Sequence, residues 1–207
     1  MARDPIGLSQ YRVQDWNRPE DIAQPLYDRA NYPAAGVGTL SFFAIARGGT
    51  ATLVRAGVTS SVSKTSRDTN LDSVGQLTGR DYLAIGMSMA FIPVQEVYSV
   101  ANTNAIVDDI QRLLHGGWLE WKVGDKSVLL LPLHLIPSYT YLQGLATTTG
   151  AAAVQNRAER GYYPLYPRVG IKRGTTFTVT LTFDGSPATV QSTDIFFSFH
   201  GVLRRPT

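Results

Sequence analysis

The chain has 207 residues, of which 43% are hydrophobic and 17% charged, and its formal net charge is +3. This composition excludes a disordered or fibrous protein and fits a domain large enough to bury a hydrophobic core. Cysteine is absent, which excludes disulfides, thiolate nucleophiles and cysteine-bound metal sites. No apolar run approaches the ~20 residues of a membrane helix, so we expect no membrane span.

The first 38 residues are predicted to form an extended arm, because prolines at 5, 19, 25 and 33 interrupt them and no period of 2 or 3.6 is sustained. Exposed aromatic side chains would be unfavourable in such an arm, so we expect its aromatics to pack on the domain or on a neighbouring subunit. These aromatics are Tyr11, Trp16, Tyr27 and Tyr32. The N-terminal stretch MARDPIGLSQ lacks the apolar region of a signal peptide, so synthesis and folding in a cytoplasm are expected.

Short strands are predicted from residue 40 onward. Residues 40–46, 51–55 and 57–63 are rich in β-prone residues, and Gly48-Gly49 suits a hairpin turn between the first two runs. Over 82–92, large and small residues alternate, so this strand is predicted to have a bulky face and a small face. The bulky face would carry Leu83, Ile85, Met87, Met89 and Phe91.

One helix of any length is predicted, over 102–117. Asn102 or Asn104 can cap its start and Gly116-Gly117 can end it. Apolar residues recur at helical spacing between these ends, at Ile106, Ile110, Leu113 and Leu114. A second small and polar stretch, 145–161, is predicted to be a long exposed loop.

The strongest strand signals lie in the second half of the chain. Residues 118–131 predict a hairpin that turns at Gly124-Asp125, with Trp121 facing the core and Trp118 facing away. Residues 176–183 alternate large apolar residues with threonine, and 194–203 begin apolar on both faces, which is typical of a central strand. The sequence therefore predicts an all-β domain, a β-sandwich or jelly roll of about eight strands with one inserted helix.

Two short stretches resemble hydrolase motifs, HGGW at 115–118 and GMSMA at 86–90. Ser88 lies within an alternating strand, whereas a nucleophilic serine of that type needs a sharp strand-to-helix turn. His115, His134 and His200 have no partner at ligand spacing, so they are interpreted as structural, with no metal, no cofactor and no small-molecule substrate expected. The prediction is a protein that is not an enzyme, and a cupin-type or hydrolase-type enzyme ranks third.

The arm, the strand-rich body and the ending TFTVTLTF…DIFFSFHGVLRRPT resemble the jelly-roll capsid proteins of double-stranded DNA bacteriophages. The resemblance implies a virion structural protein, with 39–207 as a single jelly roll and 1–38 as its arm. Such a subunit would self-assemble into an icosahedral shell or decorate one, with copies of itself and other capsid proteins as partners. The alternative is a non-enzymatic jelly-roll module that recognises carbohydrate or a receptor in a spike or fibre.

Residues expected to serve that role are the arm aromatics and two C-terminal arginines. Tyr11, Trp16, Tyr27 and Tyr32 are predicted assembly contacts, because Trp and Tyr are common interface anchors. From residue 157 onward the chain has seven basic residues against three acidic ones. Arg204 and Arg205, which close this basic stretch, are predicted to meet a neighbour's carboxylates or packaged nucleic acid. A set of solvated or interface-paired arginines is the alternative interpretation.

Overall fold

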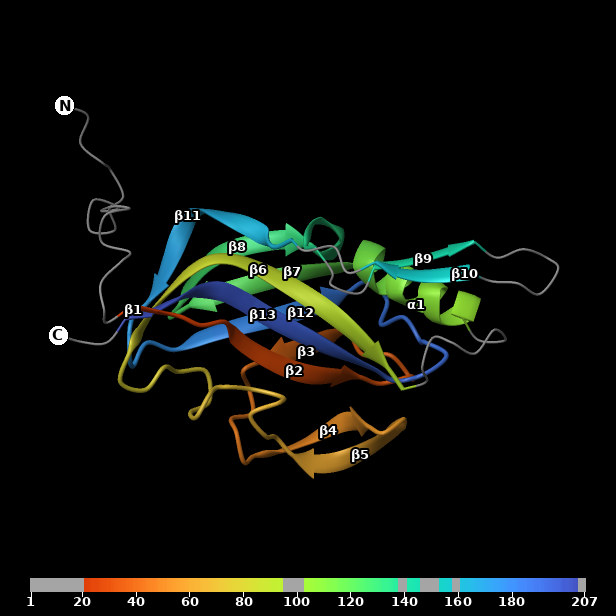
Figure 1. The fold of residues 1–207 in the computed structure, drawn as a ribbon, viewed down its shortest axis with the longest axis horizontal. Coiled ribbons are helices and arrows are strands. Elements are labelled where there is room, and N and C mark those ends of the chain that lie inside the picture. Colours follow the sequence, from red (N-terminus) through yellow and green to blue (C-terminus); the bar gives the residue numbers. More distant parts are fainter. Residues whose placement is uncertain (1–20, 95–102, 138–140, 146–152, 158–160, 205–207) are drawn as a thin grey trace.

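The structure is a computed structural model that describes residues 21–94, 103–137, 141–145, 153–157 and 161–204. Within these ranges it contains thirteen strands, the helix α1 (Thr103–Gly116) and a short 3-10 helix (Leu133–Leu135) (Figure 1). The strands are β1 (Asp21–Ala23), β2 (Leu26–Tyr32), β3 (Thr39–Phe42), β4 (Thr50–Arg55), β5 (Val58–Ser63), β6 (Asp81–Pro93), β7 (Gly117–Val123), β8 (Lys126–Pro132), β9 (Tyr141–Leu145), β10 (Ala153–Arg157), β11 (Tyr163–Ile171), β12 (Phe177–Phe183) and β13 (Thr193–Arg204).

Two antiparallel sheets form the body of the domain. One has the order β1-β13-β6-β11, with β2 also paired to β13, and the other has the order β3-β12-β7-β8. The pairs β2–β13, β3–β12, β6–β11 and β7–β8 are nested in the chain, so that strands early in the sequence pair with strands late in it. The prediction of an all-β fold with a single helix is confirmed, and β13 is a central strand as expected.

The core lies between the two sheets and is dominated by aromatic rings. The Trp121 ring of β7 lies 4.3 Å from the Phe199 ring of β13, and the Phe42 ring of β3 lies 5.5 Å from the Phe197 ring. The alternation predicted for β12 is observed, since its core-facing residues are buried between the sheets: Phe177, Val179, Leu181 and Phe183. Burial of such rings supplies the main favourable term in folding.

A β-bulge changes the predicted faces of β6. Met87, Met89 and Phe91 share one face as predicted, and this face is turned to the core. The pairing with β13 shifts between His200 and Gly201, so that Gly201 opposes Ala84 while His200 opposes Gly86. Because of the bulge, Ile85 has no residue opposite it on β13. On the N-terminal side of the bulge, Tyr82 and Ala84 are the residues that belong to the core. The prediction that Leu83 and Ile85 share one face with Met87, Met89 and Phe91 is therefore wrong, because one extra residue inverts the alternation.

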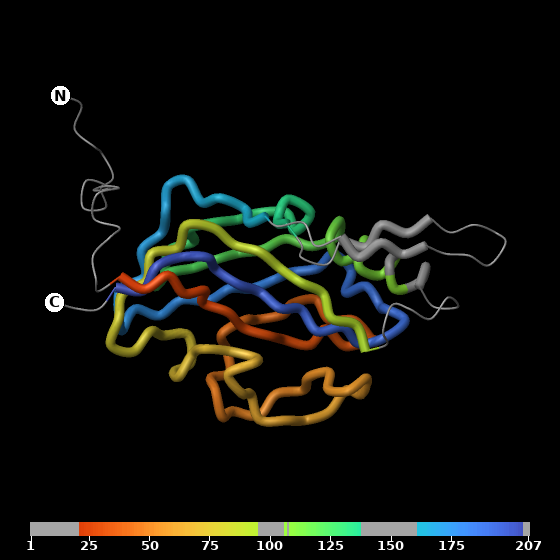
Figure 2. The backbone as a smooth tube through the Cα atoms, in the orientation of Figure 1, coloured from red at the N-terminus to blue at the C-terminus, as the bar shows by residue number. Residues whose placement is uncertain are grey.

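Three insertions interrupt the nested strands. The β4–β5 hairpin lies between β3 and β6 in sequence, α1 lies between β6 and β7, and the β9–β10 hairpin lies between β8 and β11. In the tube view the β4–β5 hairpin (orange) runs along one flank of the sandwich, next to β2 (Figure 2). The predicted helix is confirmed, with Ile106, Ile110 and Leu113 buried against the core. Among the described residues, no helix is long and apolar enough to cross a membrane.

The predicted arm differs from the structure between residues 21 and 32. β1 and β2 both pair with β13 and are therefore parts of the main sheet. The alternation in β2 is hidden in the sequence because Asp28 occupies a core-facing position, opposite Phe197. The boundary predicted at residue 38 is thus wrong for this segment, whereas residues 1–20 lie outside the described residues.

Two local predictions are also wrong. The chain does not form a hairpin at Gly48-Gly49, because β3 pairs with β12 and β4 pairs with β5. The β4–β5 turn lies at Ala56 and Gly57, both with positive φ (49° and 78°), as a tight two-residue turn requires. The predicted loop 145–161 contains β10, which pairs with β9.

Candidate functional site

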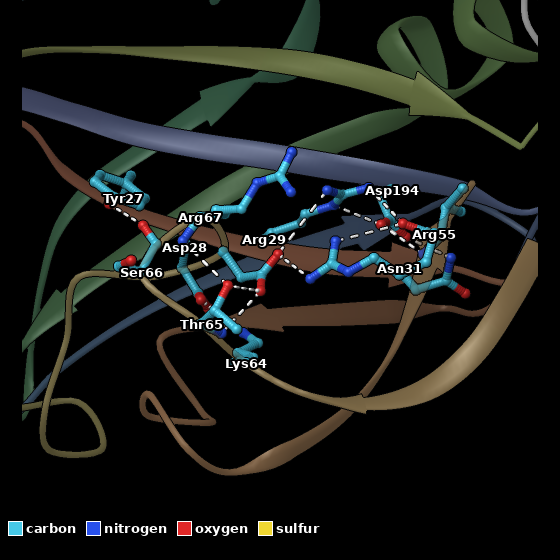
Figure 3. A network of polar contacts seen from close by, with 12 residues as sticks. Tyr27, Asp28, Arg29, Asn31, Arg55, Lys64, Thr65, Ser66, Arg67 and Asp194 are labelled. Carbon is cyan, nitrogen blue, oxygen red and sulfur yellow. Dashed lines mark hydrogen bonds and ion pairs between the residues drawn. The ribbon is translucent and has the colours of Figure 1, made fainter. Parts of the chain in front are cut away.

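A network of buried charges joins the β4–β5 hairpin to the main sheet (Figure 3). At its centre the Asp194 carboxylate of β13, which is fully buried, accepts three hydrogen bonds. Arg29 Nε donates to it at 2.6 Å, Asn31 Nδ2 at 2.7 Å and the Val54 backbone N–H at 2.8 Å. Arg29 also donates to the Val54 carbonyl at 2.9 Å. Side chains of β2 and β13 thereby hold both backbone polar groups of one residue of β4.

A second buried ion pair lies where the chain leaves the sandwich after β3. Lys64 Nζ donates to Asp28 Oδ1 at 2.6 Å, and both side chains are almost fully buried. The other oxygen, Asp28 Oδ2, accepts the Phe43 N–H at 2.6 Å. Burial raises the pKa of Asp28, and this effect outweighs the opposing effects of the Lys64 ammonium and the Phe43 N–H. Phe43 has a φ of 62°, a conformation unusual for a bulky residue, and the Asp28 carboxylate fixes it there.

A third carboxylate, Asp68, orders the loop that follows β5. It accepts hydrogen bonds from the Thr65 N–H at 2.9 Å and from the Thr65 hydroxyl at 3.1 Å, and it pairs with the Arg55 guanidinium. Burial alone would raise the pKa of Asp68, but the Thr65 N–H and Arg55 together outweigh burial and lower it. Asp68 therefore contributes stability that is present above its ordinary pKa of 3.8 and is lost as the pH falls through its folded value.

The network contains three carboxylates and three cations, so its charges balance. Its members are Asp28, Asp68, Asp194, Arg29, Arg55 and Lys64. Each carboxylate oxygen of the network accepts at least one hydrogen bond from a donor of the same chain, which suits a structural role better than a catalytic or ligand-binding one. Sequence reasoning missed this network. Its only sequence signal is a charged pair, Asp28 and Arg29, inside a stretch that also carries regularly spaced Leu26, Ala30 and Tyr32.

A separate polar cluster lies on the outer face of the β6–β13 pair. Ser88 Oγ is 2.9 Å from Ser198 Oγ and 2.8 Å from His200 Nε2. The Tyr162 ring stacks on His200 at 5.2 Å and fills the space above Gly86, where an added Cβ would lie 2.0 Å from the ring. A hydrogen bond between serine and histidine also occurs in nucleophilic catalysis. Here the Ser88 side chain is fully buried, so a substrate cannot reach it.

Partial burial gives His200 a testable pH signature. Desolvation lowers the pKa of His200 below its ordinary value of 6.5. The unfolded chain then binds a proton at higher pH than the folded chain does, so folding stability falls as the pH drops below 6.5 and levels off below the folded pKa. We expect His200→Gln to lose this part of the pH dependence. Urea unfolding of both proteins at several pH values measures the difference, and parallel pH profiles would contradict the assignment.

Two of the four predicted aromatic contacts are described, and both are engaged within the chain. Tyr32 is fully buried, and its hydroxyl donates to the Pro187 carbonyl at 2.6 Å. Tyr27 is partly buried, stacks on Phe196 at 5.4 Å between ring centres and donates its hydroxyl to the Ser66 carbonyl. Tyr32 therefore cannot contact a neighbouring subunit in this conformation. Tyr11 and Trp16 lie outside the described residues.

Arg204, one of the two predicted C-terminal contacts, forms a two-pronged ion pair within its own chain. Its Nε and Nη2 atoms donate to the two oxygens of Asp21 at 3.0 and 3.1 Å, and the Asp21 side chain is 3% exposed. The pair ties β1 to the end of β13. This geometry assigns Arg204 a role in the fold, whereas Arg205 lies outside the described residues.

We expect Arg204→Ala to cost about 1–3 kcal/mol, because the mostly buried Asp21 carboxylate loses its charged donor. Arg204→Lys retains the charge but not the planar fork, so it should recover only part of the loss. Urea unfolding measures the stability, and limited proteolysis near residues 24 and 25 reports the release of β1. An Arg204→Ala protein as stable as the wild type would show that this ion pair does not stabilise the fold.

Exposed apolar side chains lie on β8 and β11, the strands that end the two sheets, and on β7, the neighbour of β8. Leu130 is 67% exposed and Tyr166 is 85% exposed, and Trp118 and Val128 are also exposed. Val128 and Tyr166 line one groove of about 560 Å³ between β8 and β11. We call these four residues the edge surface. Trp118 and Trp121 face opposite sides of β7, with Trp121 fully buried, as the sequence predicts.

A smaller pocket of about 280 Å³ opens at the end of the sandwich near β1. Its polar lining includes Gln24, Asn70, Asp72, Gln76, Thr78 and Arg80. Three buried leucines also line it: Leu26, Leu71 and Leu77. We call it the Arg80 pocket. Sequence reasoning did not identify it, because its residues come from four separate segments of the chain.

The described histidines do not gather with acidic residues. His115 and His134 stack on each other at 5.7 Å, while His200 belongs to the serine cluster. In the part of the chain that the structure describes, no group of three or more His, Asp or Glu side chains is placed to hold a metal ion. Comparisons of the chain with family models, with curated proteins and with solved structures find no match.

Proposed function

We propose that this chain is a jelly-roll subunit of a viral shell, made in the host cytoplasm and located in the virion. The observation that carries the proposal is the nested pairing of its strands. Eight strands can be numbered one to eight in chain order: β2, β3, β6, β7, β8, β11, β12 and β13. The first strand then pairs with the eighth, the second with the seventh, the third with the sixth and the fourth with the fifth. In a jelly roll, such a ribbon of nested pairs rolls up so that its third strand lies beside its eighth and its fourth beside its seventh. The corresponding pairs in this chain, β6 with β13 and β7 with β12, are both present.

A jelly roll alone is compatible with several functions, since shell proteins, lectins and cupins all use it. The edge surface favours assembly among these functions. Large apolar side chains exposed on neighbouring strands commonly mark a contact with another protein. The ion-pair network agrees with this role, because it fixes an inserted hairpin rigidly on the flank of the subunit, where a neighbour can meet a constant shape.

A second copy of the chain is the partner that the edge surface fits best. Tyr166 projects from the same edge that contains the groove between β8 and β11. A projecting ring beside a groove is self-complementary, because each of two copies can place its ring against the groove of the other. Leu130 lies directly across from Glu120 of β7, and the Glu120 carboxylate is paired with Lys122 at 3.2 Å within the same chain.

The test is the solution mass of the purified full-length chain, measured by light scattering over a concentration series. We expect oligomers or shells, and we expect Leu130→Lys to raise the concentration needed for assembly at least about tenfold, because a buried leucine contributes ~1.5–3 kcal/mol. Val58→Lys is the matched control, since Val58 is 62% exposed on β5, away from the edge surface. A full-length chain that stays monomeric at high concentration would overturn the proposal.

A further inference from the structure

We propose that the Arg80 pocket binds a small ligand that carries a carboxylate and several hydroxyls, of the size of an acidic monosaccharide. The inference stands apart from the shell role, because a shell subunit needs no such pocket to assemble. A volume of about 280 Å³ lies just below the ~300–1,000 Å³ of pockets for drug-sized ligands, which suits a single ring. The surface of the pocket is mainly polar and only a smaller part of it is apolar, which suits a ligand rich in hydroxyls.

The central observation is that the Arg80 guanidinium lies in the pocket without a partner among the described residues. Its side chain is partly buried, and among the described residues it makes no hydrogen bond or ion pair. This contrasts with Arg29, Arg55 and Arg204, each of which is paired with a carboxylate. A guanidinium presents a planar fork of donors that matches a carboxylate in two-pronged geometry. An unpaired Arg in a pocket therefore favours an anionic ligand.

The other polar groups of the pocket divide into occupied and open ones. Asn70 is occupied, since it donates to the Pro25 carbonyl at 2.7 Å and accepts the Tyr27 N–H at 3.0 Å. The Gln24 side-chain amide and the Thr78 hydroxyl have no hydrogen-bond partner in the described part of the chain. Both can donate and accept, as ligand hydroxyls require.

The remaining lining explains why a sugar ring fits better than a bare anion. Leu26, Leu71 and Leu77 are mostly buried and leave a small apolar area in the pocket, which the C–H face of a ring can cover. Asp72 pairs with Arg47 through Oδ1, which leaves Oδ2 as an acceptor for a ligand hydroxyl. A carboxylate on Arg80, hydroxyls on Gln24, Thr78 and Asp72 and a ring on the leucines would use every open group at once.

The experiment is ligand-observed saturation-transfer NMR on the full-length chain, which works on single subunits and on assembled particles alike. D-glucuronate is the probe, with D-glucose and glutarate as comparison ligands that lack the carboxylate and the hydroxylated ring, respectively. We expect glucuronate to bind and both comparison ligands to bind at least about tenfold more weakly. Equal binding of glutarate would overturn the assignment to an acidic sugar, and no binding of glucuronate would overturn the site.

Substitutions locate the binding. Arg80→Gln should weaken glucuronate binding about 10- to 100-fold, the range that the loss of a charge-assisted hydrogen bond gives. Gln24→Ala should weaken it by a smaller factor. Arg112→Gln, at an exposed arginine of α1, is the matched control and should leave binding unchanged. Unchanged binding in Arg80→Gln would contradict the inference, and because assembly is read separately by light scattering, that failure leaves the shell proposal intact.

Discussion

Lys64→Met is expected to destabilise the protein by ~3–5 kcal/mol, the cost of removing one partner from a buried ion pair. Lys64 is the only cation bonded to Asp28 among the described residues, and both side chains are almost fully buried. Methionine preserves the length and apolar stem of the side chain, so the loss reports the missing charge rather than a cavity. A loss of this size is a large fraction of the stability of an ordinary domain.

A double variant separates the charge from the hydrogen bond. Asp28→Asn in the Lys64→Met background removes the uncompensated carboxylate but retains an acceptor for the Phe43 N–H. We expect the double variant to recover part of the lost stability, because a buried neutral amide costs less than a buried unpaired charge. Urea unfolding of the three proteins measures these differences, and a double variant less stable than Lys64→Met would contradict the explanation.

The pH dependence of the single variant follows from the same carboxylate. The pKa of Asp28 is already raised by burial, and removal of the Lys64 ammonium raises it further. An acid with a raised folded pKa favours the folded state at low pH, and this contribution is lost as the pH rises through the folded pKa. The destabilisation by Lys64→Met should therefore shrink as the pH falls towards 3.8, the ordinary pKa of Asp28. A loss that is independent of pH would show that the charge is not its cause.

Sequence reasoning identified the strands whose alternation is undisturbed. β12 alternates phenylalanine, valine and leucine with threonine, and the structure buries the large residues as predicted. The β7–β8 hairpin and α1 also carry local signals, a Gly-Asp turn in one and a glycine stop in the other. In each case the residues that define the element are close in sequence, so propensity and periodicity suffice.

The elements that the sequence did not predict are ones in which tertiary contacts override the local sequence pattern. β2 contains Asp28 and Arg29, and it is a strand because Lys64 and Asp194 neutralise these charges from distant parts of the chain. β11 contains prolines, and its pairing with β6 is interrupted between Pro164 and Val169, as the edge of a sheet permits. The Arg80 pocket follows the same rule, since only the folded chain brings Gln24 and Arg80 together.

Phe199→Ala is the second large prediction, with an expected loss of ~3–5 kcal/mol. Phe199 is fully buried on β13, and its ring contacts Trp121 of the opposite sheet at 4.3 Å and Phe197 at 4.9 Å. The Trp121 indole N–H is buried without a hydrogen-bond partner among the described residues. Packing alone therefore holds this indole, and a cavity beside it removes contacts that no polar interaction replaces.

The neighbouring Phe196 provides a matched control on the same strand. It faces outward, is partly exposed and stacks on Tyr27. Phe196→Ala should thus cost clearly less than Phe199→Ala, because less apolar surface returns to water and no cavity forms between the sheets. Phe199→Leu should cost the least of the core changes, since it retains most of the buried volume. Equal losses of stability at the two phenylalanines would mean that this aromatic contact does not hold the sheets together. The expected order of losses would show that the contact between β7 and β13 contributes most to the packing of the two sheets.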